Sequence, residues 1–164
     1  MSYHSLSNHI LGKDPFGVIA YRYDENQMEE EYSIHGIFLG IRGQCVEYAR
    51  RWLLSVREIT FPSVPDAVDI WNLDYAIHIR SQQKIPFVSV PVTERLPKVG
   101  DLAIYNRHPL YPHGHVAVVV YVSSHWIGLA EQNMSDKKWT GNCSRYIPSH
   151  TLADETALLG WKTL

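Results

Sequence analysis

The sequence has few of the features that mark membrane, secreted or nucleic-acid-binding proteins. It contains no apolar run of the roughly 20 residues that a membrane helix requires, and its first residues lack the basic-then-apolar order of a secretory signal. Only 2 cysteines are present, too few for a disulfide framework. The 15 basic and 17 acidic residues leave a net charge of −2 without a basic run, which argues against nucleic-acid and anionic-membrane partners. We therefore expect a soluble, cytoplasmic protein.

Cofactor motifs are also missing. There is no glycine-rich phosphate loop, so an ATP-dependent activity is not supported. The histidines His108, His113, His115 and His125 invite a zinc site, yet neither an HExxH motif nor paired cysteines accompany them. We expect no metal and no other cofactor.

The length and composition fit one folded unit. A chain of 164 residues with 45% hydrophobic side chains can fill one core, because domains usually contain roughly 100–200 residues. Residues 1–14 are polar and end at Asp14-Pro15, so we expect an N-terminal arm that enters a turn. Residues 15–164 show no repeat and no low-complexity linker, and we expect them to form a single domain.

The hydrophobic pattern predicts helices early in the chain and strands later. The clearest helix covers residues 46–59, where charged residues fall largely on the other side from an apolar stripe at helical spacing: Val46, Ala49, Trp52, Leu53 and Val56. A second helix is predicted over residues 66–79. Strands are predicted over residues 16–23, 102–105, 115–122, 126–131 and 157–161. This order predicts an α+β fold with an N-terminal helical half and an antiparallel β-sheet.

Cys45 has the position of a reactive thiol. It directly precedes the clearest helix, and exposed N–H groups with the positive end of the helix dipole stabilise a thiolate there. Gln44 beside it could offer its amide to a developing oxyanion. Position alone leaves a small buried hydrophobe equally open as an interpretation. Cys143 lies in a polar stretch, and we expect an ordinary loop thiol.

His115 and Glu131 are candidate partners for this cysteine. His115 opens the strand over residues 115–122, where a rigid backbone would aim a general base. Glu131 or Asn133, at the end of the next strand, can reach His115 across a hairpin and orient its imidazole. A turn histidine and an exposed hairpin end are the alternatives without a function.

Taken together, these segments resemble the CHAP family of cysteine, histidine-dependent amidohydrolases and peptidases. The resemblance is carried by Gly43-Gln44-Cys45, by residues 97–101 (PKVGD) and by residues 114–118 (GHVAV). Within the family, the sequence is most similar to the amidase domains of glutathionylspermidine synthetase/amidase and trypanothione synthetase. Residues 44–51 (QCVEYARR) and 130–133 (AEQN) carry that likeness, which spans roughly residues 15 to 162.

The resemblance implies a papain-like α+β fold and a set of roles. Cys45 would be the nucleophile, His115 the general base and Glu131 the residue that orients the imidazole. Gln44 would complete the oxyanion hole.

Two further residues match polar positions of the family. Arg50, one helical turn beyond Cys45, matches an arginine that receives a substrate carboxylate. Asn133 matches a fourth polar residue of many CHAP sites, which we place behind the reacting groups.

The implied activity is cleavage of the amide between the glycine carboxyl group of glutathione and a polyamine such as spermidine. An acyl group on Cys45 would be the intermediate. A peptidoglycan peptide, the commoner CHAP substrate, and a protein amide cleaved by an isopeptidase stay open as alternatives. A non-catalytic binding domain is a further alternative, against which the intact Cys45, His115 and Glu131 set argues.

An acidic segment could contribute to binding of a cationic substrate. Residues 24–32 are rich in acidic side chains and are expected to form a solvated loop. If the segment attracts a polyamine, replacing Glu30 and Glu31 with glutamine should raise KM at low salt.

Overall fold

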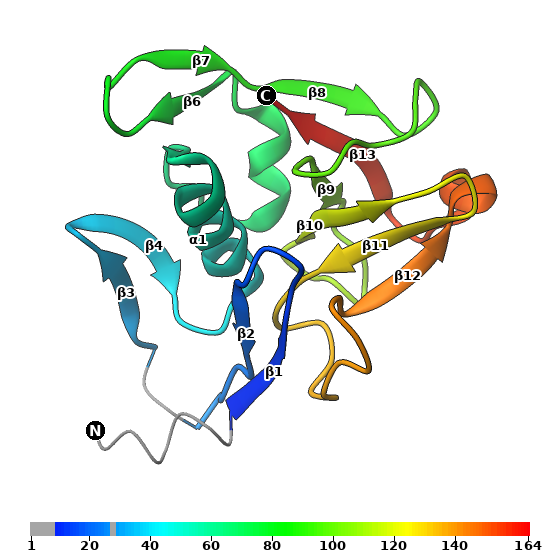
Figure 1. Ribbon diagram of the computed structural model, residues 1–164, viewed down its shortest axis with the longest axis horizontal. Coiled ribbons are helices and arrows are strands. Elements are labelled where there is room, and N and C mark those ends of the chain that lie inside the picture. Colours follow the sequence, from blue (N-terminus) through cyan, green and yellow to red (C-terminus); the bar gives the residue numbers. More distant parts are fainter. Residues whose placement is uncertain (1–8, 27–28) are drawn as a thin grey trace.

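The centre of the protein is a six-stranded sheet in which every neighbouring pair is antiparallel. The computed structural model describes residues 9–26 and 29–164. The strand order is β12-β11-β10-β9-β13-β8 (Figure 1). The bounds are β8 Val88–Pro91, β9 Leu102–Tyr105, β10 His115–Val122, β11 Trp126–Ala130, β12 Arg145–Pro148 and β13 Leu158–Thr163. A 3-10 helix, η3 (Ser149–Asp154), connects β12 to the segment before β13.

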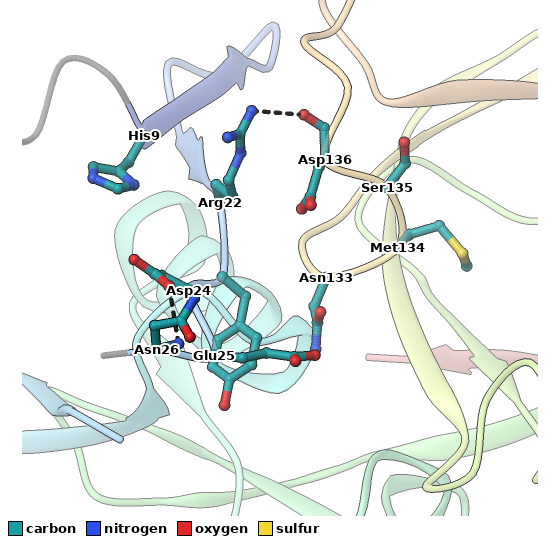
Figure 2. A pocket seen from close by; sticks show the side chains of 10 residues that line it. His9, Arg22, Asp24, Glu25, Asn26, Asn133, Met134, Ser135 and Asp136 are labelled. Carbon is teal, nitrogen blue, oxygen red and sulfur yellow. Dashed lines mark hydrogen bonds between the residues drawn. The ribbon is translucent and has the colours of Figure 1, made fainter. Parts of the chain in front are cut away.

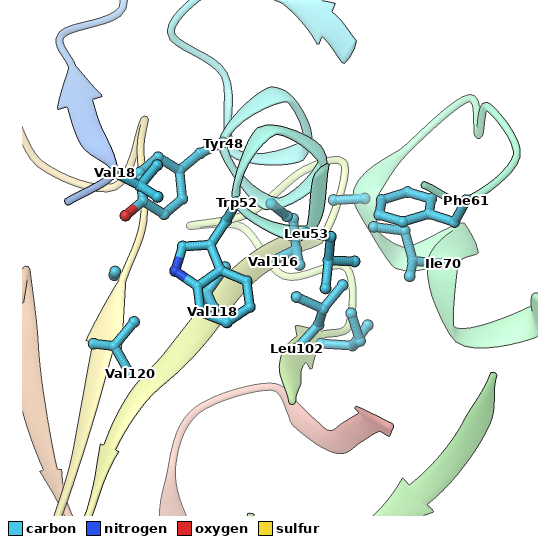
Figure 3. Close-up of a cluster of buried hydrophobic side chains, with 14 of the residues drawn as sticks. Val18, Tyr48, Trp52, Leu53, Phe61, Ile70, Leu102, Val116, Val118 and Val120 are labelled. Atoms are coloured by element: carbon cyan, nitrogen blue, oxygen red, sulfur yellow. The ribbon is translucent and has the colours of Figure 1, made fainter. Parts of the chain in front are cut away.

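The main helix, α1 (Cys45–Arg57), packs against one face of this sheet. Trp52 and Leu53 of the helix are buried against Val116 and Val118 of β10, as Figure 3 shows. Burying a side chain of this size stabilises the fold by roughly 1.5–3 kcal/mol. The contact fixes the start of α1 relative to the start of β10, the two places that carry Cys45 and His115.

The opposite side of α1 is covered by two β-hairpins that precede it in sequence (Figure 1). Strands β1 (Ile10–Lys13) and β2 (Ile19–Tyr21) form one hairpin, and β3 (Glu31–Ile34) and β4 (Ile37–Ile41) form the other. Strand β1 lies in the segment expected as an arm, whose residues 1–8 are outside the described residues. The expected strand over residues 16–23 is shorter, since β2 covers only three residues.

Because the hairpins cover it, the charged side of α1 is buried. Glu47, Arg50 and Arg51 are each less than a tenth exposed, although the helical pattern placed them away from the core. Asp14, at the turn between β1 and β2, also faces the helix. It accepts hydrogen bonds from Trp52 Nε1 (2.5 Å) and from the Tyr48 hydroxyl (3.3 Å).

The prediction of an N-terminal helical half is wrong. The second helix, expected over residues 66–79, is a single 3-10 helix, η2 (Ala67–Asn72), followed by strand β6 (Tyr75–His78). Strand β6 pairs with β5 (Ile59–Thr60) and β7 (Lys84–Pro86) in a separate three-stranded sheet. Asn72 and Asp74 favour a turn, and residues 75–79 alternate in a way that suits a strand as well as a helix.

The antiparallel sheet of the second half is confirmed. Strands β9 and β10 have the expected bounds, β11 ends one residue early, and β13 runs two residues beyond the expected end. None of the helices that the structure describes is long and apolar enough to cross a membrane.

Candidate active site

Cys45 is the first residue of α1, held there by an unusual backbone approach. Gly43 has a φ of 84°, and a Cβ at this position would lie 3.0 Å from the Cα of Tyr23. A side chain is therefore disfavoured both by conformation and by space. Gln44 follows as the N-cap residue, and its side chain makes no hydrogen bond that caps the helix. Its amide is thus free of the usual capping role and borders the same cavity as Cys45.

His115 is the first residue of β10 and follows another tight glycine. A Cβ on Gly114 would lie 2.7 Å from both the carbonyl oxygen of Tyr105 and Cβ of Val68. His115 is paired in register with Tyr105 of β9. The imidazole is buried, so its direction is fixed by the sheet and not by solvent.

Glu131 follows β11 and contacts the imidazole across the hairpin. His115 Nε2 donates to Glu131 Oε2 at 2.9 Å, with both side chains buried. Because Nε2 is engaged there, Nδ1 is the ring nitrogen left for the Cys45 thiol, which lines the same cleft as His115. The structure therefore brings together the three residues that the sequence analysis named as thiol, base and orienting carboxylate.

The electrostatics of this set favour a charged thiol and imidazole. Burial acts to raise the pKa of Cys45, but the His115 charge, its hydrogen bond and backbone N–H groups of Val46 and Val116 bring that pKa below its ordinary value. Burial likewise acts to lower the pKa of His115. The charge of Cys45 and hydrogen bonds to Cys45 and Glu131 outweigh it and raise the pKa to about 9.

Glu131 is supported from its other side by residues that the sequence analysis did not name. Arg145 Nε donates to Glu131 Oε1 at 2.7 Å, and Ser144 Oγ donates to the same oxygen at 3.2 Å. Burial would raise the pKa of this carboxyl, but the hydrogen bond and charge of His115, together with Arg145, hold it well below its usual range. No sequence signal points to Arg145, because the strand that it begins, β12, was not among the predicted strands.

Two tyrosines enclose the imidazole. The ring of Tyr105 lies 5.7 Å from that of His115, and Tyr111 stacks on His115 at 5.9 Å with an interplanar angle of 28°. Tyr111 belongs to the loop between β9 and β10 and borders the cavity that contains Cys45. These contacts restrict rotation of the ring and limit access of water to it.

Gln132 ties the start of α1 to β2 and was quoted in the sequence analysis only as part of a motif. Its Nε2 donates to the carbonyl oxygen of Gln44 (3.0 Å) and to Glu47 Oε2 (2.8 Å). Its Oε1 accepts from the backbone N–H of Tyr21 (2.8 Å) and from Arg51 Nη2 (3.0 Å). The fully buried amide of Gln132 thus makes four hydrogen bonds, and these fix the backbone next to Cys45.

The structure places Asn133 at the Cys45 cavity and Arg50 away from it. Asn133 borders the Cys45 cavity with an exposed side chain and a φ of 56°. Arg50 is buried away from that cavity's lining, where it donates to Ser63 Oγ at 3.2 Å. Burial lowers its pKa to about 10, and its Nε has no partner among the described residues. Its guanidinium lies 5.0 Å from the Phe61 ring.

The cleft at Cys45 has a volume of about 630 Å³ and an acidic rim that includes Glu25 and Glu29. A second cavity of about 550 Å³ shares Glu25 and Asn133 with it, and Figure 2 shows the side chains that line this extension. Glu30, by contrast, forms an ion pair with Arg42 at 3.3 Å. The acidic residues that border the cleft therefore belong to the expected segment, residues 24–32, but they are not the Glu30 and Glu31 chosen for substitution. Residues 27–28 of that segment lie outside the described residues.

Of the other candidates from the sequence, His113 borders the Cys45 cleft. In the described ranges, 9–26 and 29–164, no group of three His, Cys, Asp or Glu side chains is placed to hold a metal ion. Cys143 is buried near the sheet end, and its Sγ lies 3.6 Å from the carbonyl oxygen of Arg145.

The sequence of this chain is similar to those of known proteins. Glutathionylspermidine synthase of Crithidia fasciculata is 33% identical over 138 residues, covering 77% of this chain and 19% of that protein. Bifunctional glutathionylspermidine synthetase/amidase of Escherichia coli is 28% identical over 174 residues, covering 93% of this chain and 28% of that protein. The chain thus spans less than a third of the length of these relatives. The CHAP domain model matches residues 37–133, which include Cys45, His115 and Glu131. The chain therefore belongs to the CHAP domain family.

Proposed function

We propose that the protein is a cysteine amidase in which Cys45, His115 and Glu131 act as nucleophile, acid–base and orienting residue. The observation that carries the proposal is a buried imidazole that is hydrogen-bonded to Glu131 at 2.9 Å and lines the same cleft as Cys45. The lowered pKa of Cys45 and the raised pKa of His115 support a thiolate–imidazolium pair at neutral pH.

The proposed reaction has two stages. The Cys45 thiolate attacks the amide carbonyl carbon, and the imidazolium of His115 gives its proton to the leaving nitrogen. The C–N bond breaks, the amine departs, and a thioester remains on Cys45. Neutral His115 then removes a proton from water, which attacks the thioester and releases the carboxylic acid and the thiolate.

Charge that develops on the carbonyl oxygen needs donors near the start of α1. Gln44 is proposed to give its side-chain amide and Cys45 its backbone N–H, since both lie at the positive end of the helix dipole. Removing one such donor typically costs about 10²–10³-fold in kcat. Gln132 keeps Gln44 in place through the 3.0 Å bond to its carbonyl oxygen.

We further propose a glutathione–polyamine amide as the substrate. Two relatives with glutathionylspermidine in their names support this class, and the carboxylates of Glu25 and Glu29 at the cleft suit a cationic amine. Asn133, at the border between the two cavities, is proposed to contact the substrate there.

Arg50 is proposed to receive a substrate carboxylate, because no acidic side chain in the described part of the chain forms an ion pair with its buried guanidinium. The exposed ring of Phe38 lies 5.8 Å from this guanidinium. In that role, Arg50→Met raises KM more than it lowers kcat. A purely structural role would instead lower the free energy of unfolding and leave KM unchanged.

The test is release of spermidine from glutathionylspermidine, followed by mass spectrometry. Wild type should release it, Cys45→Ala should not, and Cys143→Ala should match wild type. No release by a wild-type protein whose Cys45 reacts quickly with iodoacetamide would reject this substrate while keeping the amidase. Peptidoglycan fragments and protein amides would then be tried in the same assay.

A further inference from the structure

We propose that Arg145 is a positioning residue that keeps Glu131 charged and aligned against His115, and so acts on Cys45 through two intervening side chains. The inference rests on the proposed function, because it concerns the same thiol and imidazole.

The first argument is the division of the Glu131 carboxylate between two partners. Oε2 accepts from His115 Nε2 at 2.9 Å, and Oε1 accepts from Arg145 Nε at 2.7 Å. Ser144 Oγ adds a further hydrogen bond to Oε1. With both oxygens engaged, the carboxylate cannot rotate freely, and the direction of its bond to His115 is fixed.

The second argument is charge. The Glu131 side chain is 0% exposed, and a buried carboxylate stays ionised only when a cation or several donors compensate it. His115 loses its positive charge each time it protonates a leaving group. Arg145 keeps its charge throughout, since a guanidinium does not titrate in this range. Arg145 therefore compensates Glu131 in the half of the cycle in which the imidazole is neutral.

The third argument is that Arg145 is itself held in place by the wall of the site. Its Nη1 donates to Glu155 Oε1 at 2.6 Å, and its Nη2 donates to the Tyr105 hydroxyl at 2.9 Å. Tyr105 is the strand partner of His115, and its ring packs against the imidazole. The Arg145 guanidinium thus bonds both to Glu131, the carboxylate partner of His115, and to Tyr105, whose ring packs against the imidazole.

The experiment measures the pH dependence of Cys45 alkylation by iodoacetamide, together with kcat and KM for amide hydrolysis. In Arg145→Met, we expect the pH at which the Cys45 thiolate forms to rise by roughly one unit. At a pH below this value, the thiolate fraction is then about tenfold lower than in wild type. We expect kcat to fall with little change in KM. Arg145→Lys keeps the charge without the planar fork, so it should restore the pH profile while kcat stays below wild type.

Arg95→Met is the matched control. Arg95 pairs with buried Asp101 at 2.9 Å and is 29% exposed, against 27% for Arg145, but its side chain hydrogen-bonds to Asp101 and to the carbonyl oxygen of Leu96 and not to Glu131. Losing this equivalent ion pair should leave the pH profile and kcat per folded molecule unchanged. Thermal unfolding of each variant gives the folded fraction, and if Arg145→Met fails to fold, Arg145→Lys carries the comparison.

A double-mutant cycle separates the possible failures. If Arg145 acts through Glu131, adding Arg145→Met to Glu131→Gln should cost little more than Glu131→Gln alone. Independent, additive losses, or an unchanged pH profile in Arg145→Met, would overturn the role of Arg145. If Glu131→Gln itself changes neither alkylation nor hydrolysis, the proposed triad fails instead.

Discussion

The two cysteines of this chain are the same chemical group in opposite environments. Cys45 starts a helix beside His115, and its pKa lies below the ordinary value although burial acts to raise it. No imidazole acts on the pKa of Cys143, and burial and the charge of Glu131 raise it. Glu131 therefore influences both thiols. It disfavours the Cys143 thiolate directly and favours the Cys45 thiolate through the imidazolium between them.

Polar neighbours alone do not activate a thiol in this chain. A hydrogen bond from Tyr146 and backbone groups of Leu129 and Arg145 act to lower the pKa of Cys143, but burial and the charge of Glu131 outweigh them. Cys45 differs because an imidazolium lies beside it. Five experiments test the difference between the two thiols and the site around Cys45.

The largest effect is expected from exchanging each thiol for a hydroxyl. Cys45→Ser should reduce amide hydrolysis by several orders of magnitude, as expected when a nucleophile is lost, whereas Cys143→Ser should stay within about twofold of wild type per folded molecule. Steady-state hydrolysis of the same amide by both variants checks this. Comparable losses in the two variants would contradict the assignment of the nucleophile.

The pH dependence should separate the two thiols next. Cys45 has a lowered pKa, so its alkylation should already be fast at pH 7, where an ordinary thiol with a pKa of roughly 8.5 is only a few per cent ionised. Cys143 has a raised pKa and should react only at higher pH. Peptide mass spectrometry after brief iodoacetamide treatment measures both rates in one sample.

Hydrolysis also has an alkaline limit. It needs the His115 proton, so it should rise as the Cys45 thiol ionises and fall as pH passes the His115 pKa of about 9. Each pH unit beyond that limit should cost about tenfold. A rate that keeps rising to pH 11 would exclude His115 as the proton donor.

A substitution at Gln132 tests whether alignment of the backbone at the start of α1 contributes to the difference in reactivity between Cys45 and Cys143. Gln132→Met keeps the volume but removes four hydrogen bonds around the start of α1. The free energy of unfolding should fall by about 2–3 kcal/mol, because buried partners lose their donors and acceptor. The alkylation rate of folded Cys45 should fall severalfold while that of Cys143 stays constant. Urea unfolding and alkylation of the native protein check the two parts.

The smallest effect concerns the charge at the entrance to Cys45. A cationic methanethiosulfonate should modify Cys45 a few-fold faster than an anionic one at low salt, because Glu25 and Glu29 border the cleft. The double variant Glu25→Gln/Glu29→Gln should abolish that preference. Glu30→Gln/Glu31→Gln is the control with the same charge change, and it should retain the preference. Equal loss of the preference for the cationic reagent in both double variants would contradict a local effect of Glu25 and Glu29 and would indicate an effect of the overall charge.

Strands β9 and β10 could be predicted because they are buried on both faces over most of their length. Residues 102–105 and 115–122 are continuous apolar runs with turn signals beside them, and both strands have the expected bounds. Residues 66–79 misled the analysis, since their apolar spacing fits a helix while a turn and pairing with β5 and β7 decide the outcome.

The candidate site was predictable only where local position carries the chemistry. Cys45 before a helix and His115 at a strand start are local signals, and the hairpin spacing brought Glu131 to His115. Arg145 escaped because β12 was not among the predicted strands, and Gln132 and the buried charges of α1 escaped because their partners come from distant segments. A helix pattern cannot reveal that two hairpins will cover its polar side.

The position of β13 has a consequence for synthesis of the protein. This strand lies inside the sheet, hydrogen-bonded to β9 on one side and β8 on the other. Both neighbours leave the ribosome earlier, and each keeps an unpaired edge, open to other nascent chains, until residues 158–163 follow. Strand β9 also aligns β10 and His115. Closure of the sheet, and with it the final setting of the imidazole, therefore waits for β13, which follows both of its neighbours in the sequence.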